Sequence, residues 1–249
     1  SAERRLDQLR AVQPAMALEV EALVALTPFR LATRAELEDL RERLENFDAD
    51  AVPPSVSQGV WFSAANGLHP LLRSYLLGVV SARLGDREAA RRYAAEAARL
   101  RVPPSTGSLQ DDIVRRVRAT AALASGDTAA ALAQLEGMRF QVWHQLSIAS
   151  PLISGAAERY LLATLLEQAG RDAEAIRWYG TFEGLAGHDR LYAAPAHSRR
   201  GTIYEQLGDR ERAELHYRRF AALWRDADSE FQPMVEEAEG ALARLASEP

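Results

Sequence analysis

Histidines are the side chains best suited to metal binding and acid–base chemistry, and this chain has five of them, His69, His144, His188, His197 and His216. None lies in the His-Glu-x-x-His pattern, which places two imidazoles on one helix face for zinc. His188 and Asp189 could approach His197 across a loop as metal ligands, but a solvated loop and a helix cap are the simpler interpretation. His216 lies beside Tyr217 and is expected to have a structural role. We therefore expect no metal and no cofactor.

Most routes to covalent catalysis are excluded by composition. All thirty positively charged residues are Arg, and the chain has neither Lys nor Cys. Lysine Schiff bases, a P-loop lysine, thiolate nucleophiles, Cys-ligated zinc and disulfides are therefore excluded. The chain also has no Gly-x-Ser-x-Gly elbow and no Gly-rich phosphate loop. The carboxylates of Glu236, Glu237 and Glu239 are expected to form a solvated helix face. We expect a protein that is not an enzyme.

Arginine and aromatic side chains remain as candidates for ligand binding. Arg83, Arg116 and Arg199 could hold a carboxylate, a phosphate or an acidic peptide by bidentate hydrogen bonds, although solvated surface arginines look the same in sequence.

Two charge-free stretches, 51–72 and 140–157, contain Trp61, Phe62 and Trp143. Pro, Ser, Gln, Asn and His interrupt both stretches, so neither is expected to span a membrane. These aromatic residues either fill gaps where irregular repeats meet or act as anchors on a binding face, where aromatic side chains dominate the energetics. We include Trp143 among the candidate binding residues.

Charge and targeting signals limit the possible partners. A formal net charge of −5 argues against direct nucleic-acid binding, which usually needs a basic face. Residues 1–10 are charged, with no apolar segment of a signal peptide behind them. The chain begins without Met, so we expect it to be part of a longer polypeptide, in the cytoplasm.

The elements that must position these side chains are predicted by a repeated pattern. Gly85, Gly126, Gly170 and Gly208 are each followed five residues later by an Ala (Ala90, Ala131, Ala175 and Ala213). The glycine would end one helix in a left-handed conformation, and the alanine would let the next helix pack closely on it. Recurrence at 38 to 44 residues predicts a stacked array of helix pairs.

The periodicity of apolar residues predicts where these helices lie. One long helix or two, broken near Pro14, cover residues 2–26. The Thr33 and Glu36 spacing of a capping box begins a helix that ends near Phe47. The predicted helix pairs are 68–84 with 87–100, 110–124 with 128–138, 156–168 with 172–182, and 196–206 with 211–224, and a last helix covers 233–246. We expect N-terminal helices in 1–54, as a degenerate repeat or a linker, four helix pairs in 55–232, and a capping helix in 233–249.

Here a family resemblance becomes specific. The segment from Gly201 to Tyr217 resembles a tetratricopeptide repeat (TPR), with small and aromatic residues at its characteristic positions around Gly208 and Ala213. Residues 149–245, including Ala149-Ser-Pro151 and 223–228 (Leu-Trp-Arg-Asp-Ala-Asp), resemble the C-terminal TPR regions of large multidomain bacterial regulators. In such proteins the array follows a Ser/Thr kinase or a DNA-binding transcriptional-regulator domain.

The resemblance implies an all-α, right-handed α-solenoid of antiparallel helix pairs that binds a protein or peptide without catalysis. Ligands of such arrays lie in a groove lined by the first helix of each pair. The residues that map to this groove are Tyr75, Arg83, Arg116, Thr120, Tyr160, Thr164, Gln168, Ser198, Arg199, Thr202 and Gln206. The alternatives are a sensor domain that binds a small anion and regulates a linked kinase or transcription activator, and self-assembly into a homo-oligomer.

Overall fold

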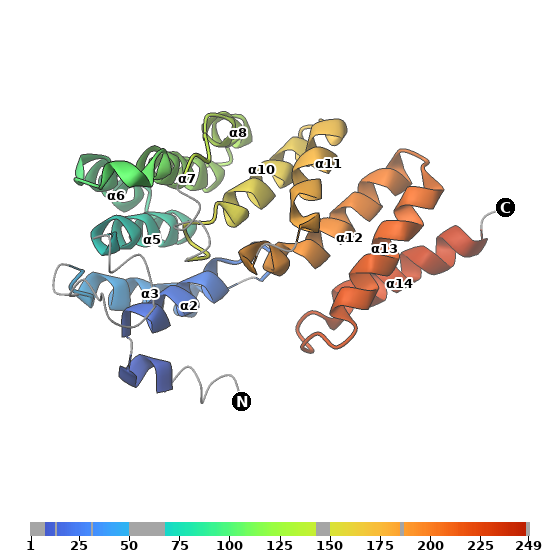
Figure 1. Ribbon diagram of the computed structural model, residues 1–249, viewed down its shortest axis with the longest axis horizontal. Helices are drawn as coiled ribbons and strands as arrows, with labels where there is room; N and C mark the ends of the chain where they lie inside the picture. The colour runs from blue at the N-terminus through green and yellow to red at the C-terminus, as the bar shows by residue number, and fades with distance from the viewer. Residues whose placement is uncertain are drawn as a thin grey trace. The chain divides into compact units, whose positions relative to one another are not determined.

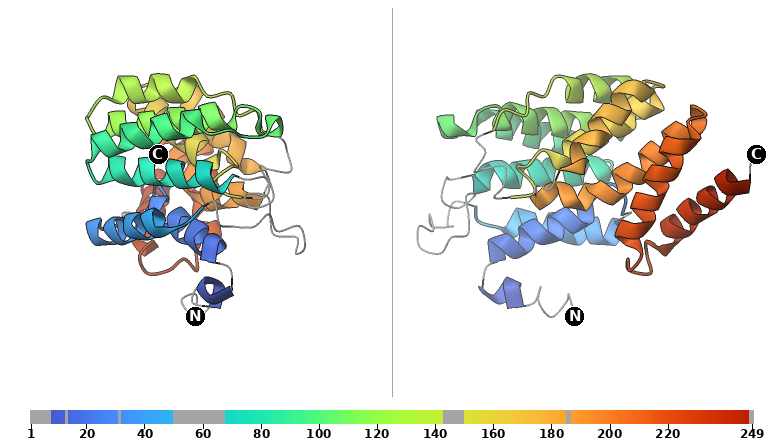
Figure 2. Two further views of the ribbon diagram at one scale, coloured as in Figure 1. Left: turned by 90° about the vertical axis from the view of Figure 1, so that its left-hand side faces the viewer. Right: turned by 45° about the vertical axis from the view of Figure 1, so that its right-hand side comes forward.

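The computed structural model describes residues 8–12, 14–30, 32–49, 68–142, 150–184 and 187–247, and the secondary structure in these ranges is entirely helical (Figure 1). The predicted all-α class is confirmed. Consecutive helices pack as antiparallel pairs joined by short turns, the arrangement of a TPR-like α-solenoid, as the two further views also show (Figure 2). Trp61, Phe62 and Trp143 lie outside the described residues.

The chain divides into two compact units, Ser1–Glu158 and Arg159–Pro249. Among the described residues, the first unit contains α2 (Pro14–Leu26), α3 (Arg34–Asn46), α5 (His69–Arg83), α6 (Arg87–Arg99), η1 (Pro104–Thr106), α7 (Leu109–Leu123) and α8 (Thr128–Glu136). Helix α10 (Ala156–Gln168) begins at the end of this unit. The second unit continues with α11 (Asp172–Gly180), η2 (Thr181–Glu183), η3 (Gly187–Asp189), α12 (Arg190–Gln206), α13 (Arg210–Trp224) and α14 (Gln232–Ser247). The domain boundaries predicted at residues 54 and 232 stay a prediction.

The four repeat turns have the predicted backbone conformation. Gly85, Gly126, Gly170 and Gly208 all have positive φ, between +71° and +85°. An L side chain enters this region only at a cost in free energy, so glycine is favoured there. The alanines five residues later are fully buried, at 0% exposure, and let the second helix of each pair approach the first.

Three of the second helices begin with an aspartate cap. Asp86 accepts a hydrogen bond from the backbone N–H of Ala89 at 3.0 Å, and Asp209 accepts one from Arg212 at 3.1 Å. Asp127 caps α8 in the same way. Each cap satisfies one of the backbone donors that a helix leaves unpaired at its first turn.

Leucine-rich faces of α3 and α5, with an Ile- and Val-rich face of α7, form the core of the first unit. Leu40, Leu44, Leu77 and Val80 are at most 1% exposed. The predicted capping box begins α3: Thr33 Oγ1 accepts from the Glu36 N–H at 3.2 Å, and the Glu36 carboxylate accepts from the Thr33 N–H at 2.7 Å. These reciprocal hydrogen bonds satisfy two backbone donors and fix where α3 begins.

Aromatic side chains form much of the buried core of the second unit. Tyr179, Phe182 and Phe220 are at most 1% exposed. The rings of Tyr160 and Tyr179 meet edge-on with centroids 5.4 Å apart, a favourable geometry for two aromatic quadrupoles. This packing gives the first helices of the unit, α10 and α12, a rigid support.

The predicted start of α12 is wrong. We expected the helix to begin at residue 196, after Pro195, but it begins at Arg190 with Pro195 inside it. At the sixth helical position, Pro195 cannot donate the backbone hydrogen bond to the carbonyl of residue 191, so the longer helix depends on other contacts. The Arg159 guanidinium donates to Asp189, just before the helix, at 2.6 Å and supports the earlier start.

Candidate functional site

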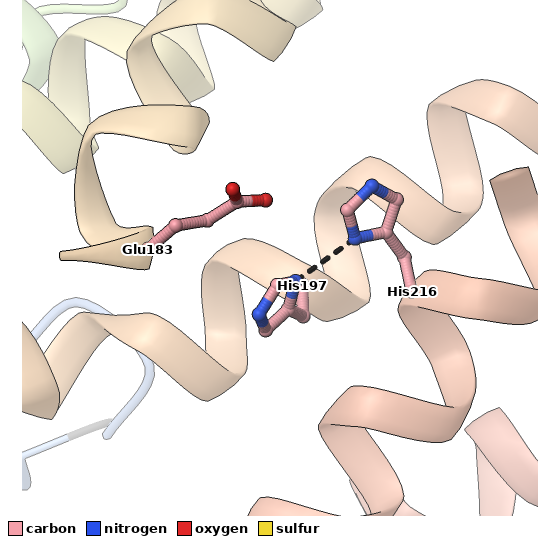
Figure 3. Close-up of side chains that lie close together, drawn as sticks. All are labelled: Glu183, His197 and His216. Carbon is pink, nitrogen blue, oxygen red and sulfur yellow. Dashed lines mark hydrogen bonds between the residues drawn. The ribbon is translucent and has the colours of Figure 1, made fainter.

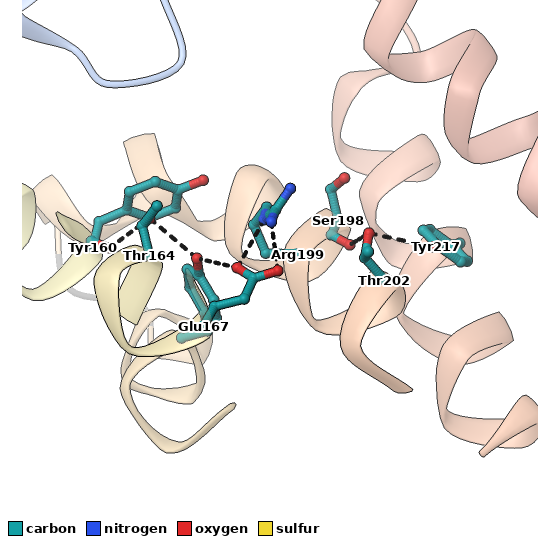
Figure 4. A network of polar contacts seen from close by, with 8 residues as sticks. Tyr160, Thr164, Glu167, Ser198, Arg199, Thr202 and Tyr217 are labelled. Carbon is teal, nitrogen blue, oxygen red and sulfur yellow. Dashed lines mark hydrogen bonds and ion pairs between the residues drawn. The ribbon is translucent and has the colours of Figure 1, made fainter. Parts of the chain in front are cut away.

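In the second unit, Thr164 and Glu167 on α10, Tyr179 on α11 and Arg199 on α12 form a polar network (Figure 4). The Glu167 carboxylate on α10 accepts a hydrogen bond from Arg199 Nε at 3.0 Å and a second, short one from Arg199 Nη2. It also accepts from the Tyr179 hydroxyl at 2.9 Å, and Thr164 Oγ1 lies 3.1 Å from that hydroxyl. Because the contact between Arg199 and Glu167 is bidentate, the position of Arg199 on α12 is well defined.

The network has a counterpart one helix pair further along. Tyr217 on α13 donates from its hydroxyl to Glu205 at 2.7 Å, and the same oxygen lies 3.4 Å from Thr202 Oγ1. Arg244 on α14 donates to Glu205 at 3.2 Å. Both helix pairs therefore join a tyrosine on the second helix to a threonine and a glutamate on the first, which is the internal regularity expected of a repeat.

Arg199 is charged at neutral pH, and Tyr179 and Tyr217 keep their hydroxyl protons. Burial opposes protonation of Arg199, but its hydrogen bonds with Glu167 outweigh burial and raise the pKa of the guanidinium. Burial raises the pKa of Tyr179 well above its usual value and that of Tyr217 to about 12. These phenols remain hydrogen-bond donors at neutral pH and do not act as bases.

Exposure differs among the predicted groove residues of this unit. Gln168 and Gln206, at the ends of α10 and α12, are exposed, whereas Thr164 and Thr202 are half-buried. Tyr160 is 7% exposed and packs its ring against the aromatic core. The accessible hydrogen-bonding groups of this face are therefore mainly the two glutamine amides and Arg199, whose side chain is 42% exposed.

In the first unit, Tyr75, Arg83 and Arg116 meet internal partners. The Tyr75 hydroxyl donates to the Glu158 carboxylate at 2.8 Å, and Arg116 Nε lies 3.6 Å from the same carboxylate oxygen. Arg83 donates to the backbone carbonyl of Ala25 at 2.8 Å. Burial and the neighbouring Arg116 both lower the pKa of Arg83. That these arginines bind a ligand's acidic group stays a prediction, and Trp143 cannot be placed.

A cluster of three side chains that the sequence analysis did not predict lies between η2 and the α12–α13 hairpin. Glu183, His197 and His216 each place one potential ligand atom within 4.8 Å of the others (Figure 3). The Asp189 considered in the sequence is instead paired with Arg159 at 2.6 Å. Facing histidines could have been suspected from the repeat itself, because His197 and His216 lie eleven residues before and eight residues after the Gly208 turn.

The α12–α13 hairpin is the part of the chain that matches a known family. Residues 194–223 match the family model described as tetratricopeptide repeat. The chain contains a tetratricopeptide repeat. The matched residues begin inside α12 and end one residue before the end of α13. Comparisons with curated proteins and with solved structures gave no significant match. In the part of the chain that the structure describes, no helix is both long and apolar enough to cross a membrane.

Proposed function

We propose that this chain is a non-catalytic binding scaffold that recognises a protein or peptide on the face formed by α10 and α12. The observation that carries the proposal is the tetratricopeptide repeat at residues 194–223, because repeats of this family generally serve protein–protein interaction. The proposal includes attachment to a larger bacterial regulatory protein and a cytoplasmic location, both of which stay predictions.

The α10–α12 face offers hydrogen-bonding groups in fixed positions. Glu167 holds the Arg199 guanidinium from one side, and Figure 4 shows another nitrogen of the same group pointing away from that carboxylate. An arginine fixed in this way loses little conformational freedom when it donates to a peptide carbonyl or carboxylate. The exposed amides of Gln168 and Gln206 can each donate to and accept from a peptide backbone.

Selection from a displayed library of random peptides tests this function without knowledge of the natural partner. The whole chain is the bait, and enriched peptides are measured against a Gln168→Arg/Gln206→Arg variant. Both glutamines are exposed, so the variant should fold normally. The matched control is Arg218→Gln on α13, whose side chain is 71% exposed.

The scaffold proposal predicts saturable binding that weakens about tenfold or more in the glutamine variant, the loss expected when about 1.4 kcal/mol of contacts is removed, and not in the control. If no peptide is enriched, or if both variants bind alike, the α10–α12 face is not a peptide-binding site.

A small anionic ligand is the second candidate function, and it concerns the first unit. Arg83 lies close enough to Arg116 for the second guanidinium to help lower the pKa of the first. Two neighbouring guanidinium groups with one carboxylate, Glu158, form a locally positive environment. Calorimetric titration with phosphate and with citrate tests this alternative: heat that is lost in Arg83→Gln supports it, and no heat in the parent chain contradicts it.

A further inference from the structure

Three potential metal ligands converge from three separate elements of the second unit (Figure 3). Glu183 lies on η2, His197 on α12 and His216 on α13. The Nδ1 atoms of the two histidines are 2.9 Å apart, and the Glu183 carboxylate offers an oxygen within 4.8 Å. The two imidazoles are 7% and 3% exposed, so they are held inside the hairpin.

Aromatic packing fixes the orientation of these imidazoles. The His216 ring stacks on Tyr204, with centroids 5.5 Å apart and planes 5° from parallel. The His216 ring also stacks on the His197 ring, with centroids 5.1 Å apart and an angle of 27° between the ring planes. Rings held in this way cannot rotate freely, and a preoriented ligand set loses less entropy when it binds an ion.

We propose that Glu183, His197 and His216 form a binding site for a divalent transition-metal ion of the zinc class. The two Nδ1 atoms and one carboxylate oxygen would supply three ligands, and water would occupy the fourth position. Two Zn–N bonds of about 2.0–2.1 Å at a tetrahedral angle place the nitrogens about 3.3 Å apart, so the two imidazoles need a shift of only a few tenths of an ångström. The Glu183 carboxylate oxygen, which lies within 4.8 Å of the ring nitrogens, would move towards the ion by rotation of its exposed side chain. Imidazole and carboxylate together suit this class of ion better than Mg²⁺ or Ca²⁺.

The protonation state of the pair is compatible with metal binding. Burial, mainly, lowers the pKa of His197 and of His216 to about 4, so both rings are neutral at pH 7. Without an ion, one Nδ1 must carry a proton and the other must accept it. With an ion, both rings need the tautomer that carries its proton on Nε2, which requires no net release of protons from two neutral rings.

Two arginines beside the cluster moderate its affinity. Arg200 Nη1 donates a short hydrogen bond to Glu183 Oε1, and Arg219 Nη1 lies 3.7 Å from the same oxygen. Both contacts end on Oε1, so the metal ligand would be Oε2. The two arginines would then fix the orientation of the carboxylate through its other oxygen. Their positive charges repel a cation, so we expect weaker binding than in a site without them.

A bound ion would join η2 to both helices of the α12–α13 hairpin, a consequence independent of peptide binding on the α10–α12 face. The site is open to solvent at Glu183, whose side chain is 42% exposed. An ion can therefore enter without unfolding of the hairpin, and it should raise the thermal stability of the folded chain by mass action.

Titration of the whole chain with Zn²⁺ by calorimetry, and with Co²⁺ by visible absorption and proton NMR, tests the proposal. We expect one saturable site. Paramagnetic Co²⁺ should shift the ring resonances of His197 and His216 and leave those of the other three histidines in place. Glu183→Gln and His216→Ala should each weaken binding about tenfold or more, the usual scale for loss of a ligand or its close support. His188→Ala is the matched control and should bind as the parent chain does.

Arg219→Gln gives a prediction of opposite sign. Removing a positive charge near a divalent ion in largely aqueous surroundings should tighten Zn²⁺ binding about threefold. The proposal is overturned if the parent chain binds no Zn²⁺ or Co²⁺ saturably, if the shifted resonances belong to other histidines, or if His188→Ala abolishes binding. Because Glu183 lies at the surface, Glu183→Gln keeps the test decisive even if His216→Ala does not fold.

Discussion

Replacement of Gly201 by alanine should destabilise the second unit, although alanine is the better helix former. Gly201 lies in the middle of α12, where it faces the ring of Tyr217 on α13. A Cβ atom at this position would be 2.7 Å from Cδ1 of that ring and 2.8 Å from Cε1. The ring cannot easily move away, because Tyr217 is 5% exposed and its hydroxyl is bound to Glu205 at 2.7 Å.

Two opposing contributions determine the magnitude. Alanine in a helix interior is favoured over glycine by about 1 kcal/mol. Insertion of an extra carbon into a packed contact costs about 1–3 kcal/mol. The steric contribution should win, and we expect Gly201→Ala to lower the free energy of unfolding by about 1 kcal/mol. The matched control is Gly240→Ala on α14, where the added Cβ would only reach Arg244 Nη1 at 3.9 Å. That variant should be stabilised by about 0.5–1 kcal/mol.

Urea unfolding followed by circular dichroism measures both free energies in the same chain. The sign of the difference decides the argument, because propensity alone would stabilise both variants. The double variant Gly201→Ala/Tyr217→Leu adds a second test: the steric cost should largely disappear once the ring is absent. Equal stabilisation by Gly201→Ala and Gly240→Ala would refute the proposed close contact between α12 and α13.

Four further predictions concern a repeat turn, the capping box, the titration of Glu36 and the polar network. Gly208→Ala should lower the free energy of unfolding by about 1 kcal/mol, because φ is +74° and no neighbouring atom lies near enough to add a clash. Thr33→Ala should cost about 1 kcal/mol through loss of the capping box, measured by urea unfolding. The hydrogen bond from Arg30, followed by those from Thr33, lowers the pKa of Glu36 from 4.5 to about 2. The ionised Glu36 carboxylate therefore stabilises the folded state fully above pH 4.5, and this stabilisation is lost as the pH falls towards 2. Unfolding measured across this range should show a smaller pH dependence in Glu36→Gln, and an unchanged one would contradict the assignment. Glu167→Ala removes the bidentate acceptor of Arg199 and the carboxylate to which Tyr179 donates, and should cost about 2 kcal/mol, whereas a cost near zero would show that the network is not formed.

The repeat turns could be predicted because their determinants are local. A glycine with positive φ, an aspartate cap and a small residue one turn later depend on neighbours within a few residues, and Gly85 and Asp86 show all of this in one short segment. The start of α12 could not be predicted in the same way. It depends on Arg159, which is distant in sequence and supports Asp189 by an ion pair, so Pro195 alone was misleading.

In the candidate sites, too, the local features could be predicted and the contacts between distant residues could not. Arg199 could be selected from its helical position, but its partner Glu167 lies 32 residues away, and periodicity does not identify which carboxylate meets it. The Gly208 turn brings His197 and His216 to facing positions, but their contact also requires the rotation of both helices about their axes, and Glu183 approaches from a third element. Contacts of this kind are set by tertiary packing, whereas the class of fold is set by repeated local patterns.

Amide chemical-shift mapping with an enriched peptide tests the central claim, that the first helices of the pairs form the binding face. The account predicts that the largest shifts fall on α10 and α12, around Gln168, Arg199 and Gln206, and that the exposed face of α13 around Arg218 changes little. Shifts concentrated on α13 or α14, with α10 and α12 unchanged, would contradict it.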